Sequence, residues 1–428
     1  MEAAARVPDV VAPPPGHPRF PLVDSLRALA FFMVFTIHAV ATAGVFLAGG
    51  NEWYAPYVAR MEVCLPIFFA ISGFLLYRPF VAARLEGRPR PRLRAYARAR
   101  VLRLVPAYWA VLTVVAVYPG IQGDWSEYWW GYYLFLQNYV PSWNQGTFLQ
   151  TWSLTVEVAY YALLPLFSVL AARMARGGTR RATLRGELLL VGGLYATSVL
   201  FRLALTLIGY EASVRGVVSS PREAFSGLLP GTLYSAFPAT CDWFALGLGL
   251  AVVSAYLHGK PAQPRLVRIV RDHPGAPWAL AGALFLALVW FGPDFPEPFR
   301  PFSWFVTHAT YGAITVLFLV PAIFGHTAGG AVRRLLASRV LTWLGVVSYG
   351  LFLWHVVALQ EIRRRGAFEV PGVPRTVEIF IAGLALAIPC AAASYYLLER
   401  PLLRLKHRSQ KKPRPAGLDP AAQARLSE

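Results

Sequence analysis

Charged residues are scarce in this chain. Only 15% of its 428 residues are Asp, Glu, Lys or Arg, whereas about 25% is usual in soluble domains. Acidic residues are rarer than basic ones: the chain has 22 Asp and Glu and 41 Lys and Arg, which gives a formal net charge of +19. This low charged fraction, together with 56% hydrophobic residues, excludes an ordinary soluble globular protein.

Cysteine is also rare. The three cysteines, Cys64, Cys241 and Cys390, lie in apolar stretches and show no paired spacing. We interpret them as small core residues, and the sequence predicts neither a disulfide framework nor a metal site. A convincing internal repeat is missing too, so the chain lacks the usual signature of an inverted-repeat transporter.

Long apolar runs, in contrast, recur along the whole chain. About 20 apolar residues in a helix cross a bilayer, and ten candidate spans lie at 24–47, 60–82, 101–118, 152–172, 187–208, 233–256, 276–292, 303–324, 340–360 and 376–398. The sequence therefore predicts an all-α, polytopic bundle of about ten transmembrane helices. The span 276–292 is short and the span 303–324 contains His308, so either of these two could be tilted or irregular.

The two ends of the chain differ from its middle. Residues 1–21 are rich in proline, which predicts a disordered cytoplasmic tail, and the first apolar run is too long for the core of a cleavable signal. Residues 401–428 are basic and predict a second cytoplasmic tail near anionic lipid. Residues 22–400 between them form the predicted membrane domain and leave no stretch for an appended soluble domain.

The distribution of Lys and Arg predicts the orientation in the membrane. Of the 41 Lys and Arg, 31 fall in residues 1–21, in residues 400–428 and in the alternate loops 78–103, 173–185, 257–275 and 325–339. Positive residues favour the cytoplasmic side, so both termini and these loops are predicted to face the cytoplasm, with the protein in the plasma membrane. Since the charges follow topology, we expect no nucleic-acid partner.

The first span carries three ionisable residues, Asp24, Arg27 and His38. Such groups are costly inside a membrane and are read as functional by default. Arg27 and His38 are eleven residues apart, so they share nearly the same helix face and stand roughly 16 Å apart along its axis. Asp24 lies one turn from Arg27 and can pair with it.

Two further spans place ionisable groups at a similar depth. Glu157 lies in TWSLTVEVAYYALLPL and His355 in SYGLFLWHVV. Because a helix needs about 20 residues to cross the membrane, the positions of both residues along their spans place them at about the same depth as His38. We therefore predict a shared polar cavity, with Trp152 and Tyr161 of the same TWSL element assigned to its wall or to the acceptor. A satisfied interfacial carboxylate and a structural hydrogen bond of His355 are the alternative interpretations.

Three more ionisable residues lie within apolar stretches. Asp242 and Arg202 either pair with each other or line the cavity, and pairing is the safer interpretation. Glu399 stands at the end of the last span, level with Arg27 and Arg78, and we expect it to order those arginines.

Arginines gather at the cytoplasmic ends of the second and third spans. Arg78 closes ISGFLLYRPF, in which Ser72 and Gly73 allow another helix to approach closely. Arg100 and Arg103 precede the third span three residues apart, and guanidinium groups suit phosphate oxygens. We assign these three arginines and Ser72, together with the arginine of the first span, to a phosphorylated ligand. For the arginines before the third span the alternative is a topology signal that contacts lipid headgroups. For Ser72, Gly73 and Arg78 it is a packing notch with a snorkelling arginine.

Taken together, these motifs resemble the acyltransferase family 3 of integral membrane proteins. The matching pieces occur in the family's order, cover about residues 20–405, and read LVDSLRALAFFMVFTIHAV, SGFLLYR, RLVPAYW, TWSLTVEVAYYALLPL, SYGLFLWH and LLERPL. The resemblance implies a ten-helix enzyme that moves an acyl group from cytoplasmic acyl-coenzyme A, expected to be acetyl-coenzyme A, to a hydroxyl of a sugar or glycosylated molecule. The family's essential histidine corresponds to His38, two of its arginines to Arg27 and Arg78, and its WSLxxE carboxylate to Glu157.

The mechanism that we expect has His38 take a proton from the acceptor hydroxyl, because a neutral imidazole suits that role. Glu157 orients or charge-balances His38, and Asp24 serves as the partner of Arg27. The arginines hold the coenzyme A phosphates, so that the pantetheine arm runs inward along the face shared by Arg27 and His38.

A non-enzymatic transporter or flippase of a glycosylated or polyprenyl-linked product is the alternative function, because midplane ionisable residues are expected there as well. A scaffold for envelope synthesis is a third possibility. The one-sided arginine cluster, aligned with a single deep histidine, favours the enzyme. The acceptor stays open among an envelope polysaccharide, a lipid-linked sugar and a secreted natural product.

Overall fold

The computed structural model describes residues 20–46, 52–118, 129–140, 149–175, 178–214, 233–260, 263–292, 301–325, 331–366 and 371–408. Residues 1–19 and 409–428, which make up most of the two predicted tails, lie outside the described residues. Within the described ranges the chain forms helices and contains no strand.

The helices follow one another along the chain with short connections. Their bounds are α1 Pro21–Thr42, α2 Ala55–Arg60, η1 Met61–Val63, α3 Cys64–Leu85, α4 Leu93–Val117, α5 Trp129–Tyr133, η2 Gln137–Tyr139, η3 Leu149–Thr151, α6 Trp152–Met174, α7 Arg180–Val214, α10 Phe237–Leu257, α11 Arg265–Asp272, α12 Gly275–Phe291, α13 Pro301–Phe324, α14 Ala331–Leu336, α15 Arg339–Val346, α16 Ser348–Arg365, α17 Arg375–Ser394, η4 Tyr395–Glu399 and α18 Arg400–Arg408.

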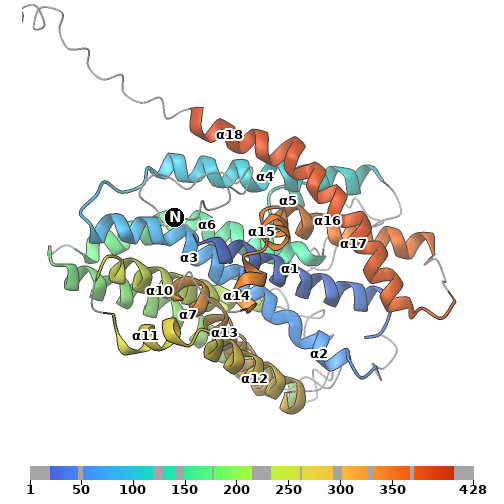
Figure 1. Cartoon of the computed structure of the whole chain (residues 1–428), viewed down its shortest axis with the longest axis horizontal. Helices are drawn as coiled ribbons and strands as arrows, with labels where there is room; N and C mark the ends of the chain where they lie inside the picture. The colour runs from blue at the N-terminus through green and yellow to red at the C-terminus, as the bar shows by residue number, and fades with distance from the viewer. Residues whose placement is uncertain are drawn as a thin grey trace, which may run out of the picture.

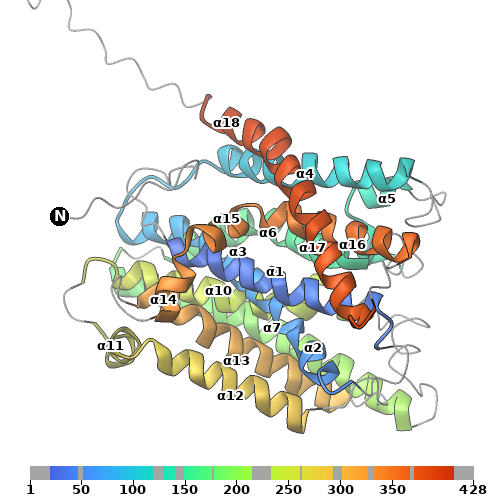
Figure 2. The ribbon, with the colours of Figure 1, turned by 45° about the vertical axis from the view of Figure 1, so that its right-hand side comes forward.

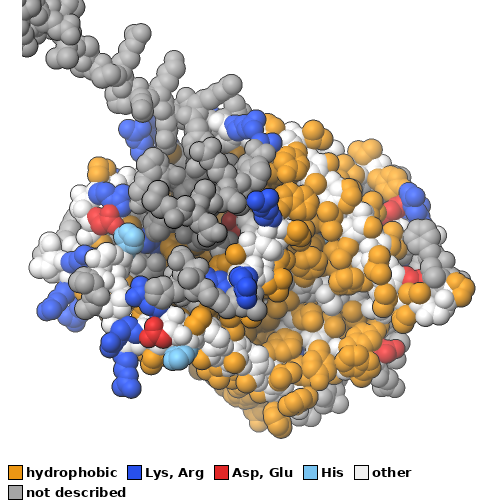
Figure 3. All heavy atoms as spheres, viewed as in Figure 1, with side chains coloured by type: hydrophobic (Ala, Val, Ile, Leu, Met, Phe, Trp, Pro, Cys, Tyr) orange, Lys and Arg blue, Asp and Glu red, His pale blue; other side chains and the backbone are white. Residues whose placement is uncertain are grey.

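The described helices confirm a polytopic membrane bundle. Eight of them are long and apolar enough to cross a bilayer, and two bent helix pairs bring the number to ten. The long helices run side by side, with α4 against α18 at one edge and α12 against α13 at the other (Figures 1 and 2). Figure 3 shows a broad hydrophobic band around the middle, with most of the visible Lys and Arg side chains gathered at one end. Hydrophobic side chains on this outer surface suit contact with lipid tails.

The two spans that we expected to be irregular differ from each other. The helices α11 and α12 meet at a bend of 89°, where Pro274 removes a backbone donor and pushes the residue before it out of the helical region. The helix α13 is continuous through His308, and His308 Nε2 lies 2.7 Å from a carboxylate oxygen of Asp242. That contact satisfies a polar group that would otherwise be costly at this depth.

The ninth predicted span is not one straight helix. The helices α15 and α16 meet at a bend of 75°, and α15 crosses the start of α1. A Cβ atom added at Gly345 would lie only 1.9 Å from the carbonyl oxygen of Asp24, so only glycine permits this close approach. The bend turns the first residues of α16 toward the interior of the bundle, where they line the site described below.

The centre of the bundle is the contact between α3 and α10. A Cβ atom at Gly73 would lie 2.6 Å from the carbonyl oxygen of Phe244, and one at Gly247 would lie 2.1 Å from that of Ala70. The prediction that Gly73 lets another helix approach is therefore confirmed. Small residues at such a crossing allow two membrane helices to gain van der Waals contact along their length.

Candidate active site

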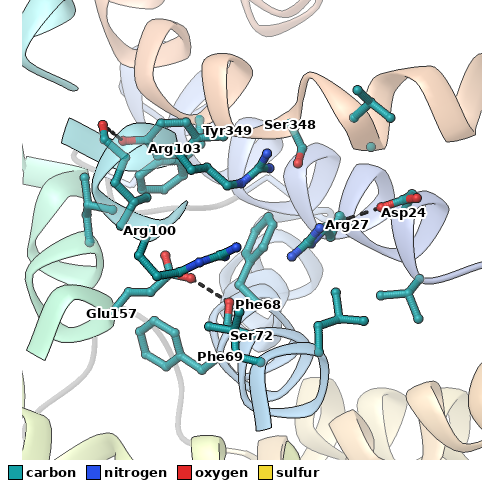
Figure 4. A pocket seen from close by; sticks show the side chains of 18 of the residues that line it. Asp24, Arg27, Phe68, Phe69, Ser72, Arg100, Arg103, Glu157, Ser348 and Tyr349 are labelled. Atoms are coloured by element: carbon teal, nitrogen blue, oxygen red, sulfur yellow. Dashed lines mark hydrogen bonds and ion pairs between the residues drawn. The ribbon is translucent and has the colours of Figure 1, made fainter. Parts of the chain in front are cut away.

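A cavity of about 430 Å³ opens among α1, α3, α4, α6 and the turn from α15 to α16. We call it the arginine cavity, because Arg27, Arg100 and Arg103 line it, together with the carboxylates Asp24 and Glu157. In Figure 4 the three guanidinium groups reach into the same space, Arg27 from α1 and the other two from α4. The helix α4 can present both arginines to one cavity because residues three apart lie on one helix face.

The three arginines differ in how they are paired. Arg27 Nη1 lies 3.6 Å from Asp24 Oδ1, which confirms the pairing expected from their spacing. Arg100 Nε is buried without a hydrogen-bond partner among the described residues, and Arg103 makes no hydrogen bond or ion pair within the same ranges. A buried guanidinium nitrogen without an acceptor, such as Arg100 Nε, is rare in native proteins.

Glu157 is held by two hydroxyl groups. Its Oε1 accepts a hydrogen bond of 2.5 Å from Ser72 Oγ on α3 and another from the hydroxyl of Tyr161, one turn further along α6. All three residues line the arginine cavity. The carboxylate thus shares a cavity with the arginines, whereas His38 lines a different one, so the single shared polar cavity that we predicted is divided in two.

A second cavity, of about 360 Å³, contains His38 and is called the histidine cavity. Its other polar wall residues include Gln150 from η3, Thr307 from α13 and Glu62 from η1. Two tryptophans, one at the start of α6 and one on α13, add aromatic surface, and the first of these is the predicted cavity residue Trp152. The volume of the histidine cavity and its mostly apolar lining are both typical of small-molecule sites, which span roughly 300–1,000 Å³.

The two cavities meet at a thin wall. Leu65, Ser153 and Phe352 line both of them. A single layer of side chains therefore separates the space that holds three guanidinium groups from the space that holds the imidazole of His38.

The imidazole of His38 is bound to a second imidazole. His38 Nδ1 lies 2.9 Å from His355 Nε2, and His355 Nδ1 lies 2.6 Å from the carbonyl oxygen of Phe352. A carbonyl oxygen can only accept, so His355 Nδ1 carries the proton; in its neutral form His355 then accepts the Nδ1–H of His38. The lone pair of His38 is left on Nε2, which is the form that a general base needs.

Arg78 lies away from the arginine cavity. It is 5% exposed, its Nε donates to Ser254 Oγ at 3.1 Å, and its guanidinium group stacks on the ring of Phe20 at 5.2 Å. Of this group only Phe20 lines the cavity. Arg78 itself is not part of the cavity wall, which differs from the direct phosphate contact that we expected.

Asp242 and Arg202 line neither cavity. Asp242 accepts from Ser198 Oγ at 2.8 Å and contacts His308, while Arg202 Nε donates to the carbonyl of Ala239 at 2.8 Å. They belong to a separate buried cluster, so the alternative in which they line the cavity is corrected. The physical reason is that Asp242 and Arg202 find hydrogen-bond partners in neighbouring groups on α7, α10 and α13.

Glu399 also differs from expectation. It is 1% exposed, neither of its carboxylate oxygens has a hydrogen-bond partner, and it forms no ion pair with Arg27 or Arg78 in the described ranges.

Two polar residues of the histidine cavity, Gln150 and Thr307, were not predicted from the sequence. The only sequence signal for them is an isolated polar side chain beside an apolar stretch, which is too common to single out a site.

Known proteins are similar to this chain over most of its length. A family model described as an acyltransferase domain matches residues 21–396. Similar proteins include the peptidoglycan O-acetyltransferase OatA of Listeria monocytogenes, which is 24% identical over 355 residues, covering 78% of this chain and 48% of that protein. The exopolysaccharide production protein ExoZ of Rhizobium meliloti is 25% identical over 347 residues, covering 79% of this chain and 88% of that protein.

The chain thus spans about half the length of the similar peptidoglycan O-acetyltransferase. No solved structure matches it.

Proposed function

The chain belongs to the acyltransferase family whose model it matches, and from this membership we propose that it is a membrane O-acyltransferase. The acyl group, acetyl in the simplest case, comes from acyl-coenzyme A on the Lys- and Arg-rich side, which we place in the cytoplasm. A hydroxyl of a carbohydrate or glycosylated molecule receives it. The observation that carries the proposal is the arginine cavity, which meets the cavity of His38 at a wall of three side chains.

The donor part of the proposal rests on Arg27, Arg100 and Arg103. Coenzyme A carries a pyrophosphate and a further phosphate on its ribose, and guanidinium groups bind phosphate oxygens with short, charge-assisted hydrogen bonds. Two of the three arginines have no carboxylate bound to them, so their donors are available to such an anion. With the phosphates held there, the thioester end extends past the shared wall toward His38.

The chemical step uses His38 as a general base. Nε2 of His38 takes the proton of the acceptor hydroxyl, and the freed oxygen forms a bond to the thioester carbonyl carbon. The carbon–sulfur bond breaks, and the proton then passes from His38 to the thiolate of coenzyme A. In this scheme His355 is a positioning residue, because it holds the Nδ1–H of His38 and keeps the lone pair on Nε2.

Glu157 and Asp24 have a supporting role in the proposal. Both carboxylates lie in the arginine cavity, where they balance part of the positive charge while no donor is bound. Asp24 holds Arg27, and Glu157 holds the hydroxyl groups of Ser72 and Tyr161. We therefore propose both as positioning residues for the donor site, with Ser72 and Tyr161 as their hydrogen-bonding neighbours.

The test uses the full chain purified in lipid nanodiscs with radiolabelled acetyl-coenzyme A and a set of methyl glycosides. We expect label transfer with the parent and none above background with His38→Ala, while both proteins are thermally stabilised by coenzyme A. Transfer by His38→Ala at the parental rate contradicts the general base. An absence of coenzyme A binding in the parent contradicts the donor and favours a transporter instead.

A further inference from the structure

We propose that the histidine cavity is the acceptor subsite and takes a hydroxyl-bearing ring, such as a pyranose, which is bound through Gln150 and Thr307. The inference rests on the proposed function and adds to it the residues that recognise the acceptor. It also assigns the two substrates to two different cavities, with the donor phosphates in one and the acceptor ring in the other.

The first observation is a set of unpaired polar atoms in the cavity wall. Gln150 is only 3% exposed, yet neither its Nε2 nor its Oε1 has a hydrogen-bond partner among the described residues. Thr307 is 9% exposed, and its Oγ1 is unpaired in the same way. Buried side-chain atoms of this kind are nearly always satisfied in native proteins. Because Gln150 and Thr307 also line the cavity, we infer that its occupant supplies their partners.

The second observation is the chemical match to a sugar. A carboxamide offers one donor group and one acceptor, and a threonine hydroxyl offers both. Neighbouring hydroxyls on a ring can satisfy both functions at once, and Glu62 adds a further acceptor on the same wall. A hydrocarbon chain would leave all of these groups unpaired. The wall therefore selects against the acyl chain of the donor as the occupant.

The third observation is the aromatic surface that accompanies these polar groups. Trp152 and Trp304 line the same cavity from the start of α6 and from α13. The C–H faces of a pyranose are apolar while its edge carries hydroxyls, so aromatic rings and a few placed polar groups recognise both parts. His38 lines this cavity too, which brings the acceptor hydroxyl to the proposed base without passing the shared wall.

The test compares Gln150→Leu and Thr307→Val with Thr315→Val, using acetyl-coenzyme A and a panel of methyl glycosides of glucose, galactose and N-acetylglucosamine. Thr315 is a matched control because its Oγ1 is also buried and unpaired on α13, but it does not line the cavity. We expect Gln150→Leu and Thr307→Val to raise the KM for the glycoside by about tenfold. The affinity for acetyl-coenzyme A should stay within about twofold of the parent, and Thr315→Val should match the parent in both.

Several outcomes overturn the inference. One is an unchanged KM for the glycoside in both cavity variants, and another is the same increase in the Thr315→Val control. A third is faster transfer from octanoyl-coenzyme A in Gln150→Leu, which would mean that the cavity holds the donor's chain. Failure of the parent to acylate any glycoside also refutes the ring-shaped acceptor. In each case, if acetyl-coenzyme A still binds, the proposed donor site is not contradicted.

Discussion

Replacing His355 by leucine is expected to slow acyl transfer without weakening donor binding. His355 is fully buried and touches neither cavity, yet its two ring nitrogens connect His38 to the carbonyl oxygen of Phe352. Leucine keeps the apolar packing and removes the acceptor for the Nδ1–H of His38. The Nδ1–H of His38 then loses the side chain that holds it in place, and the proton can shift to Nε2, where His38 can no longer act as the base.

The size of the effect follows from the hydrogen bond that is lost. Leaving a buried donor unpaired costs about 1–3 kcal/mol, and about 1.4 kcal/mol corresponds to a factor of ten in rate. We therefore expect kcat to fall by about 5- to 150-fold in His355→Leu. The affinity for coenzyme A should be unchanged, because the arginine cavity that we assign to the donor lies on the other side of the shared wall.

The assay is acetyl transfer in nanodiscs, with kcat and both KM values measured separately. His355→Gln is the informative companion, because its amide oxygen can take the place of Nε2 and its amide N–H can still donate to Phe352. We expect it to recover much of the activity that His355→Leu loses. A parental kcat in His355→Leu, or equal losses in both variants at equal thermal stability, refutes the reasoning about the proton on His38.

Two other predictions concern the donor site and the helix packing. Arg103→Gln should weaken coenzyme A binding by about 10- to 150-fold, as expected for a charge-assisted hydrogen bond of about 1.5–3 kcal/mol. Arg94→Gln, at an exposed position on the same helix, should have little effect, and calorimetry with coenzyme A and dephospho-coenzyme A checks both. Gly247→Ala should destabilise the bundle by about 1–3 kcal/mol through overpacking, because its Cβ would lie 2.1 Å from the backbone of α3. Gly249→Ala, whose Cβ would lie 3.7 Å from its nearest neighbour, should melt close to the parent in a thermal scan.

Much of the fold could be predicted from the sequence because membrane insertion depends on local composition. Each of the ten apolar runs corresponds to a helix or a bent helix pair in the described ranges. The pairing of Asp24 with Arg27 was predictable for a similar reason, since helix geometry places residues three apart on one face. The bend between α15 and α16 was not predictable, because it depends on the contact of Gly345 with a helix more than 300 residues earlier.

The prediction that His38, His355 and Glu157 share one level was only partly useful. Depth in the bilayer is one coordinate, and two groups at the same depth can still face different neighbours. His38 and His355 do meet, whereas Glu157 turns toward Ser72 and Tyr161 and joins the arginines. For Asp242 and Arg202 the sequence predicted burial correctly, but it could not predict which neighbours would satisfy them.

The sequence by itself determined that the chain is a helical membrane protein and which ionisable residues enter its apolar helices, because hydropathy and helix periodicity act over a few neighbouring residues. Only the tertiary structure decided which of those residues share a cavity. His38 and His355 are 317 positions apart and lie 2.9 Å from each other. Contacts across such separations arise when helices pack through small residues such as Gly73 and Gly247, and that choice of partners depends on the whole bundle.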